Sequence, residues 1–296
     1  MLSILIPVYN TKVSGLVGDL HAQCVEAGVD FEILCYDDAS DEEYTRENSK
    51  LNGKPGVRYE QLAKNMGRAA IRNLLAAEAT YPYLLFVDAD SQVVSPDYIN
   101  RYLGLLKPGC VIYGGRQYSQ RPPDKKKILH WKYGVQRESM PVVRRRKKPF
   151  LSFMSNNFVA HKDVLREVPF DMRHRGYGYE DTLFAFRLKK HGYTVVHTDN
   201  PLLHTGLEDT DVFLSKTIQA IENLVWMYKR GEIETTRMID YYRNLKRLFV
   251  LPLLTGFVAK RKKRIFENLY SANPDLRLLQ MYKLYVFDML YAKKGE

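Results

Sequence analysis

The sequence has few cysteines and no long apolar run. Its three cysteines, Cys24, Cys35 and Cys110, are odd in number and form no Cys-x-x-Cys pair. This argues against a disulfide framework or a zinc site and is typical of a reducing compartment. No stretch reaches the roughly 18–20 apolar residues of a membrane-spanning helix, and the longest candidate, 248–259, contains Pro252. The first residues also lack the basic segment of a signal peptide. We therefore expect a cytoplasmic protein.

Acidic residues are scarce in two segments of this basic chain, whose net charge is +11. Residues 121–148 contain eleven Lys and Arg against two acids, and residues 243–264 contain eight Lys and Arg and no acid. Such segments occur in nucleic-acid-binding proteins, in enzymes that meet anionic lipid, and as solvated loops. Residues 121–148 have no clear periodicity, so we expect a long mobile loop or hairpin there.

What the sequence does contain is an alternation of apolar strands and helices. Hydrophobic residues make up 45% of the chain, which is enough for a packed core. Strands are predicted at 2–8, 31–36, 57–60, 83–87 and 111–113, with helices at 13–27 and 64–79. Nearly continuous apolar strands between helices indicate an α/β fold, with a largely parallel sheet covered on both faces. Beyond residue 207 the apolar residues recur at helical spacing, which predicts a helical region over 208–296.

Polar side chains follow two of the predicted strands at the point where each strand ends. Asp88 and Asp90 lie two residues apart, so both carboxylates project to the same side. Two hard oxygen ligands suit Mg²⁺ or Mn²⁺ holding a diphosphate, although such pairs also cap turns. Asp37 and Asp38 end the second strand in the same way. Their carboxylates would accept from the N3–H of uracil or, alternatively, cap the next helix.

A third polar segment opens the helix predicted at 64–79. It contains Asn65, Gly67 and a pair of arginines, Arg68 and Arg72, at i and i+4. Helix N-termini attract anions, and arginine matches the geometry of phosphate. The segment therefore indicates a phosphate site or, more simply, a solvated basic face with a packing glycine.

These segments, taken in order, resemble the family-2 inverting glycosyltransferases of the GT-A fold. The matching segments are 6–10 (Ile-Pro-Val-Tyr-Asn), 37–40 (Asp-Asp-Ala-Ser), 65–73, 86–90 (Phe-Val-Asp-Ala-Asp), 156–160, 170–171 and 176–183. Each alone is unspecific, but the set in this order is hard to obtain by accident. The resemblance implies a Rossmann-like GT-A catalytic domain over 1–207. The helical region over 208–296 would then associate with a membrane or a partner.

The resemblance also implies roles for residues on the donor side. The nucleotide-sugar site would comprise Pro7, Tyr9, Asp37, Asp38, Asn65, Gly67, Arg72, Asp88 and Asn156. Within it, Tyr9 would flank the uracil ring and Asp38 would accept from its N3–H. Asp90 would be the main protein ligand of the metal, with Asp88 on the ribose and metal side.

Two further motifs complete the expected site. His204 would be a second protein ligand of the metal, unless it is a buried structural histidine. Asp181 would be the catalytic base, and Glu180 beside it would bind an acceptor or donor hydroxyl. Read without the other motifs, this acidic pair is an ordinary helix N-terminus. An inverting displacement requires such a layout, because one carboxylate must take the acceptor proton while the charge of the leaving diphosphate is neutralised elsewhere.

The expected function is inverting transfer of a hexose or N-acetylhexosamine from a UDP-sugar to a glycan or lipid-linked acceptor, in cell-surface polysaccharide synthesis. Mn²⁺ or Mg²⁺ would be the cofactor. The basic segments would hold the enzyme peripherally on the anionic inner face of a membrane, and no nucleic acid is expected as a partner. One alternative is a sugar-nucleotide nucleotidyltransferase, which would need a Gly-rich basic loop where residues 7–10 read Pro-Val-Tyr-Asn. The other is a nucleic-acid-binding protein, which would leave the strand-end acids without a role.

Overall fold

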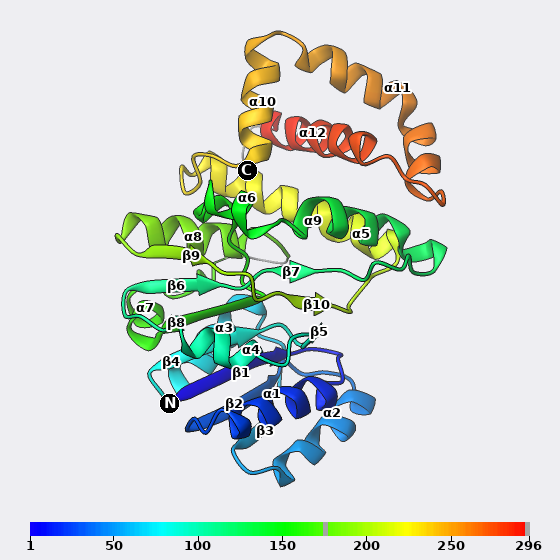
Figure 1. Cartoon of the computed structure of the whole chain (residues 1–296). Helices are drawn as coiled ribbons and strands as arrows, with labels where there is room; N and C mark the ends of the chain where they lie inside the picture. Colours follow the sequence, from blue (N-terminus) through cyan, green and yellow to red (C-terminus); the bar gives the residue numbers. More distant parts are fainter. Residues whose placement is uncertain (174–176, 294–296) are drawn as a thin grey trace. The chain divides into compact units, whose positions relative to one another are not determined.

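The computed structural model describes residues 1–173 and 177–293, and these form two compact units (Figure 1). The first unit comprises Met1–Ser119, Ser139–Arg173 and Glu180–Gly206. The second comprises Gln120–Glu138 and the described residues of His174–Tyr179 and Leu207–Glu296. Each unit is described separately below.

A seven-stranded sheet forms the centre of the first unit, in the order β3-β2-β1-β4-β8-β6-β9. Its strands are β1 (Leu2–Val8), β2 (Phe31–Asp37), β3 (Val57–Gln61), β4 (Tyr83–Val87), β6 (Cys110–Tyr113), β8 (Asn157–His161) and β9 (Thr194–His197). Strand β8 is antiparallel to β4 and β6, and the other neighbouring pairs are parallel. The predicted, largely parallel sheet is confirmed.

The register of the sheet brings several strand ends to one edge. Val8 pairs with Asp37, the last residue of β2, and Val87 at the end of β4 pairs with Asn157 at the start of the antiparallel strand β8. Residues that follow β1, β2 and β4 therefore share this edge with those that precede β8. Open α/β sheets bind ligands at such an edge.

Helices cover both faces of the sheet (Figure 1), as expected. Those of the first unit are α1 (Ser14–Glu26), α2 (Glu42–Asn48), α3 (Arg68–Glu78), α4 (Tyr98–Leu103), α6 (Val142–Arg146), α7 (Lys162–Glu167) and α8 (Glu180–Lys190), with the 3₁₀ turns η1 (Ser49–Gly53) and η4 (Phe150–Ser152). Strand β1 shows why both faces are covered. Its Leu5 packs in the core with Leu75 of α3, whereas Ile4 packs in the opposite core with Val17 of α1. Alternate residues of a strand face opposite sides, so an apolar strand must be buried on both.

A small second sheet lies in the same unit, in the order β5-β10-β7. Its strands are β5 (Ser91–Gln92), β10 (Leu202–His204) and β7 (Arg116–Gln117). His204 pairs with Ser91, which places it next to the residues that follow β4. The sequence did not predict β5 and β7, because two-residue strands show no periodicity.

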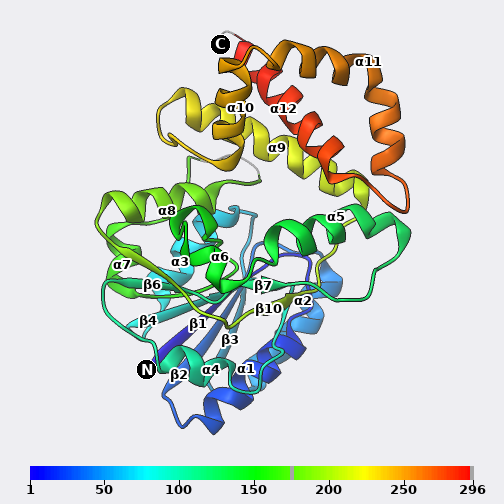
Figure 2. The same ribbon diagram turned by 45° about the horizontal axis from the view of Figure 1, so that its top comes forward.

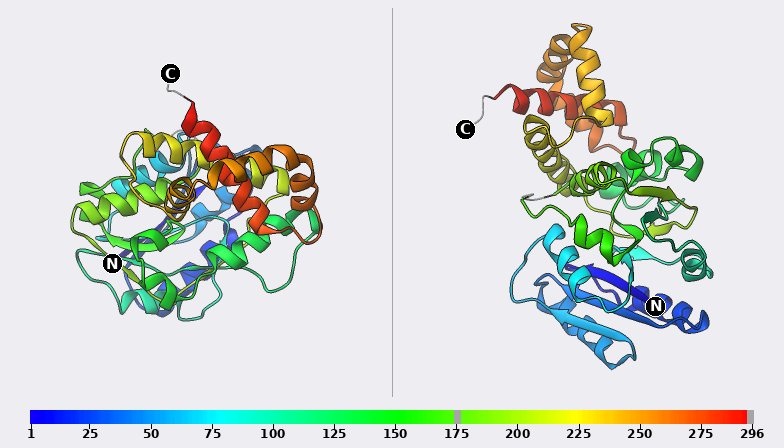
Figure 3. Two further views of the ribbon diagram at one scale, coloured as in Figure 1. Left: turned by 90° about the horizontal axis from the view of Figure 1, so that it is seen from above. Right: turned by 90° about the vertical axis from the view of Figure 1, so that its left-hand side faces the viewer.

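The second unit is helical, as expected for the C-terminal region. It contains α5 (Ile128–Tyr133), α9 (Thr210–Lys229), α10 (Arg237–Arg247), α11 (Leu251–Leu269) and α12 (Leu276–Ala292), with the short turns η2 (Lys125–Lys127) and η3 (Gly134–Glu138). Helix α12 packs against both α9 and α11 (Figures 2 and 3). In the described parts of the chain, no helix combines the length and the apolar character needed to cross a bilayer.

The loop or hairpin predicted for 121–148 is wrong, because the segment folds into the short helices η2, α5, η3 and α6. The reason is tertiary packing. Leu129 of α5 is buried in the helical core, and the ring of His130 stacks on Phe213 with the ring centroids 4.7 Å apart. Helices this short contain too few buried apolar residues to show a helical period in the sequence.

Candidate active site

Asp38, at the end of β2, holds the N-terminal loop of α3. Its Oδ1 accepts a hydrogen bond from the backbone N–H of Met66 at 2.7 Å, and its Oδ2 accepts from Gly67 N–H at 2.9 Å. Gly67 has φ +85°, a left-handed conformation that glycine adopts most easily. The side chain of Asn65 donates to the backbone carbonyl of Asp38 at 3.0 Å. The structure thus unites three of the predicted donor-site residues in one loop.

Asp37 makes a different set of contacts. It is fully buried, and it accepts hydrogen bonds from Ser40 N–H and from the hydroxyl of Tyr59, both at 2.7 Å. Its neighbour across the β1–β2 pair is Val8, which leads to the exposed Tyr9. Asp37 stabilises the strand-end turn, while Tyr9 leaves its ring open to solvent at the ligand edge.

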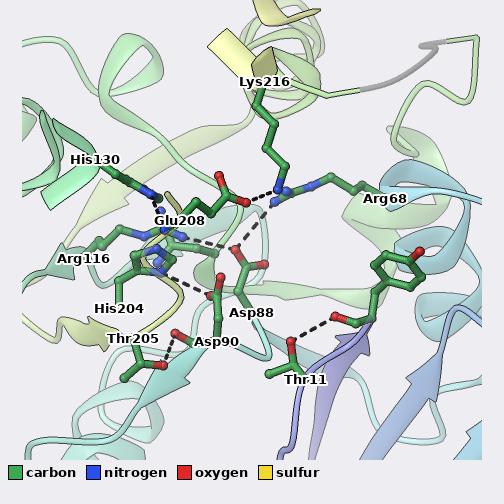
Figure 4. A network of polar contacts seen from close by, with 12 residues as sticks. Thr11, Arg68, Asp88, Asp90, Arg116, His130, His204, Thr205, Glu208 and Lys216 are labelled. Atoms are coloured by element: carbon green, nitrogen blue, oxygen red, sulfur yellow. Dashed lines mark hydrogen bonds and ion pairs between the residues drawn. The ribbon is translucent and has the colours of Figure 1, made fainter. Parts of the chain in front are cut away.

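Asp88 is a buried carboxylate held by arginines. Arg72 Nη2 lies 2.7 Å from Asp88 Oδ1, and Arg116 Nη2 lies 3.3 Å from Oδ2. Arg68 Nη2 lies 3.8 Å from the same Oδ2 (Figure 4). Three guanidinium groups thus approach one carboxylate, and arginine recognises phosphate well. Asp88 therefore forms ion pairs with three arginine side chains.

Asp90 and His204 meet beside this cluster (Figure 4). His204 Nδ1 lies 3.3 Å from Asp90 Oδ1, which is buried and accepts no hydrogen bond from the described residues. Gly206 packs so closely that a Cβ there would lie 2.5 Å from Asp90 Oδ2. Burial tends to raise the pKa of Asp90, but the imidazole of His204 and the charge of Arg116 hold that pKa below its usual value.

The Asp90–His204 pair fits a divalent cation. A carboxylate oxygen without a hydrogen-bond donor and an adjacent imidazole are donors that Mn²⁺ accepts. Asp88 fits less well as a direct ligand, because arginines contact both of its oxygens. Within residues 1–173 and 177–293, no group of three or more His, Cys, Asp or Glu side chains has the geometry of a complete metal site. Water and phosphate oxygens would therefore supply the remaining ligands.

Glu180 and Asp181 occupy the first turn of α8. Glu180 is buried, and its Oε1 lies 2.9 Å from Arg68 Nε. Asp181 is half-buried and accepts a hydrogen bond from Thr182 N–H at 2.6 Å. Burial, and then the charge of Glu180, raise the pKa of Asp181 to about 7. A carboxyl group with this pKa can take up a proton near neutral pH.

Asn156 joins the site through its backbone. Its carbonyl accepts a hydrogen bond from Asp88 N–H at 3.0 Å, and its buried Nδ2 has no hydrogen-bond partner among the described residues. Pro7 lies within β1, where it pairs with Tyr36. Tyr9, Asp37, Asp38, Asp88, Asp90, Asn156 and His204 thus lie at or next to strand ends of one unit, whereas Arg72 lies in α3 and Glu180 and Asp181 lie in α8.

The sequence did not identify Arg116 as a site residue. It lies in β7, after the Gly114-Gly115 pair, and reaches Asp88 from 28 positions along the chain. Gly115 has φ +110°, which favours glycine, and a Cβ there would lie 2.8 Å from Nη2 of Arg145. The two glycines were the only sequence signal near Arg116.

Comparisons with known proteins agree with this geometry. The model of the family described as Glycosyl transferase family 2 matches residues 3–168. No curated protein matches the chain in sequence.

Two solved glycosyltransferases have similar folds. The mannosyltransferase PcManGT from Pyrobaculum calidifontis, in complex with GDP-Man and Mn²⁺, is 13% identical with a TM-score of 0.61, covering 100% of this chain and 88% of its own. TarS 1–349 from S. aureus, in complex with UDP-GlcNAc, is 15% identical with a TM-score of 0.54, covering 98% of this chain and 89% of its own. At these identities the likeness concerns the fold, and it agrees with the expected GT-A architecture.

Proposed function

This chain is a member of glycosyl transferase family 2, and from that premise we propose that it is a metal-dependent, inverting hexosyltransferase. It would move a hexose or N-acetylhexosamine from a UDP-sugar to a glycan or lipid-linked acceptor in cell-surface polysaccharide synthesis. The observation that carries the proposal is the meeting of Asp90 and His204, 3.3 Å apart, beside the arginine-held Asp88. Cation ligands and guanidinium groups at one strand edge suit a sugar nucleotide's diphosphate.

On the donor side, the diphosphate would lie against the positive charge of Arg68 and Arg116. Asp90 and His204 would hold Mn²⁺ or Mg²⁺, which when bound offsets the charge of the leaving diphosphate. The similar structures were solved with GDP-Man and Mn²⁺ or with UDP-GlcNAc, which supports a nucleotide-sugar donor in general. We assign uracil as the base because Asp38 and Tyr9 stand at the end of adjacent strands.

On the acceptor side, Asp181 would take the proton of the attacking hydroxyl. The acceptor oxygen forms a bond to the anomeric carbon as the bond from that carbon to the diphosphate breaks on the opposite face, which inverts the configuration. The proton passes to the carboxylate of Asp181, whose raised pKa suits this role near neutral pH. Glu180, held by Arg68, would bind a sugar hydroxyl.

We further propose that the catalytic domain spans 1–207 and that residues 208–296 serve membrane or partner association. The support is the division of the chain, since Leu207–Glu296 belongs to the helical unit. The basic segment 243–264 lies in this unit and would hold the enzyme at the cytoplasmic face of an anionic membrane, near a lipid-linked acceptor.

A screen of UDP-, GDP- and TDP-sugars by thermal shift with Mn²⁺ tests the donor assignment. We expect a UDP-sugar to raise the unfolding temperature, and the rise to disappear with EDTA. Transfer products then identify the linkage by NMR. Stabilisation by a GDP-sugar alone would overturn the uracil assignment, and a retained anomeric configuration would overturn the inverting mechanism.

A further inference from the structure

Large apolar side chains are exposed in and after the turn that joins α10 to α11, whose course Figure 1 shows. Phe249 is 85% exposed, Leu253 is 74% exposed and Leu248 is 64% exposed. Single exposed apolar residues are common, but a group of large ones within six positions indicates an interaction surface. We define Leu248, Phe249 and Leu253 as the apolar tip.

The backbone conformation of Phe249 is a second reason to assign the apolar tip a function. Phe249 has φ +58°, in the left-handed region where glycine or asparagine usually stands after a helix. Its N–H donates to Lys246 O at 3.1 Å, and Val250 N–H donates to Leu245 O at 3.0 Å, which completes the cap of α10. Folding alone favours a glycine at this position. A phenylalanine that is both strained and exposed is better explained by a contact outside the chain.

Basic side chains continue the same face of α11. Leu253, Phe257, Lys260 and Arg264 recur at helical spacing and are exposed, opposite a buried face that includes Val258. Arg261 extends this face, with its guanidinium carbon 5.1 Å from the centre of the Phe257 ring. We define Lys260, Arg261 and Arg264 as the basic stripe. One outward face of α11 is therefore apolar at its start and cationic along its second half.

We infer that the apolar tip inserts into the headgroup region of an anionic bilayer while the basic stripe of α11 lies on the headgroups of the same leaflet. An apolar group beside exposed Lys and Arg is the pattern of helices that lie in a membrane interface. Residues 243–264 contain no acidic residue, so no like charge opposes anionic lipid from the apolar tip to Arg264, and the first acid of α11 is Glu267 near its C-terminus. The basic stripe could also bind a nucleic acid, but nucleic-acid binding would not explain the exposed Phe249, Leu248 and Leu253.

This inference deepens the proposed membrane contact by naming the residues that make it. It does not require the transferase reaction, because vesicle binding is measured without donor or acceptor. A failure of the proposed enzyme activity would leave vesicle binding unchanged, and a failure of vesicle binding would leave donor binding and transfer to a water-soluble acceptor unchanged.

The experiment is co-sedimentation of the full chain with phosphatidylcholine vesicles, with and without phosphatidylglycerol, at physiological salt. We expect binding to the anionic vesicles, and at least tenfold weaker binding for Phe249→Gly and for Leu253→Ser. Phe249→Gly also relieves the left-handed strain, so its unfolding temperature should equal or exceed that of the wild type. Its matched control is Val25→Ser, which removes an exposed apolar side chain from α1.

The basic stripe is tested by charge reversal in the double variant Lys260→Glu with Arg264→Glu. Its control, Lys189→Glu with Lys190→Glu, changes the net charge equally on the exposed end of α8. We expect only the first pair to lose vesicle binding. Wild-type binding by the tip variants, or equal binding to neutral vesicles, would overturn the inference. So would a loss of self-association by Phe249→Gly in light scattering, because the tip would then join two copies of the chain.

Discussion

Arg68 and Glu180 form an ion pair at 2.9 Å that joins the first turn of α3 to the first turn of α8. Helix α3 begins at the loop held by Asp38, and α8 carries Asp181. The pair therefore links the proposed phosphate side of the site to the proposed base. Arg68 also approaches Asp88 (Figure 4), so donor binding that draws on Arg68 would alter the surroundings of Asp181.

Replacing Arg68 should shift the pH dependence of transfer. Arg68 lowers the pKa of Asp181, whereas Glu180 raises it. In Arg68→Gln the charge of Glu180 still raises the pKa of Asp181, and Arg68 no longer lowers it. The acidic limb of the kcat profile should therefore move to higher pH. We expect a shift of less than about one unit, because Arg68 is partly exposed to solvent. The measurement is kcat against pH at saturating donor. Arg58→Gln, which breaks an exposed pair with Glu60, is the control and should leave the profile in place.

Asp181→Asn should abolish transfer while retaining UDP binding. The amide has the shape of the carboxylate but cannot take the acceptor proton, so kcat should fall by about 10²-fold or more. Calorimetry with UDP and Mn²⁺ should give an affinity near that of the wild type. Asp163→Asn alters an exposed acid in α7 and should change neither quantity. Transfer at the wild-type rate by Asp181→Asn would remove Asp181 from the role of base.

The raised pKa of Asp181 also predicts a dependence of stability on pH. The folded protein holds this proton more tightly than the unfolded chain, because the pKa of Asp181 is about 7 in the fold and its ordinary value is 3.8. The free energy of unfolding therefore decreases as the pH rises from about 4 to 7, because the unfolded chain loses this proton before the folded protein does. Asp181→Asn should melt above the wild type at pH 8 and close to it at pH 4. Calorimetric scans at the two pH values measure this, and an equal shift at both would contradict it.

Asp90→Ala should weaken metal-dependent UDP binding itself. Removing one of two protein ligands typically lowers metal affinity by about tenfold or more. The readout is the Mn²⁺-dependent rise in unfolding temperature with UDP, and His204→Ala should lose it as well. Asp97→Ala removes an exposed carboxylate nearby in the chain and is the matched control. An undiminished Mn²⁺ effect in Asp90→Ala would place the metal elsewhere.

Gly206→Ala should disturb the same site without removing any ligand. Its new Cβ would lie 2.5 Å from Asp90 Oδ2, so the carboxylate must move. We expect weaker Mn²⁺-dependent UDP binding from this single methyl group. Gly18→Ala is the control, since a Cβ there meets nothing within 4 Å, and it should stabilise α1 slightly. If both variants bound UDP equally, the position of Asp90 would not matter for the donor.

The sequence predicted the large sheet because its strands are long and apolar. Strand β1, for example, is buried on both faces and bounded by a polar turn, so Leu2–Val8 was predicted with its observed bounds. The segment 121–148 was mispredicted because its helices are short and depend on contacts such as that of Leu129 in the helical core. Local pattern cannot reveal contacts that only the tertiary fold creates.

Site residues that belong to motifs after predicted strands could be predicted from the sequence. Ion pairs between residues far apart in the sequence could not. The structure brings together Asp90 and His204, the two residues that the family resemblance implied as metal ligands. Asp90 follows a predicted strand, whereas strand β10, which carries His204, was not predicted. The sequence identified Arg68 and Arg72 but not their contacts with Asp88, and it missed Arg116, which reaches Asp88 from β7, a two-residue strand. The sequence placed Asp37 in the donor site, whereas its observed contacts are those of a buried turn residue.

Strand β8 runs antiparallel to β4 and β6, and this has a consequence for how the segment between β6 and β8 can change. The chain leaves the sheet after β6 and returns at the start of β8, so residues 114–156 depart from and re-enter the same edge. An excursion anchored in this way can lengthen, shorten or exchange its helices without altering the register of any strand. Its two ends stay beside Asp88 through Arg116 and Asn156. Changes confined to the middle of this segment therefore leave in place both the strands of the large sheet and the two ends beside Asp88.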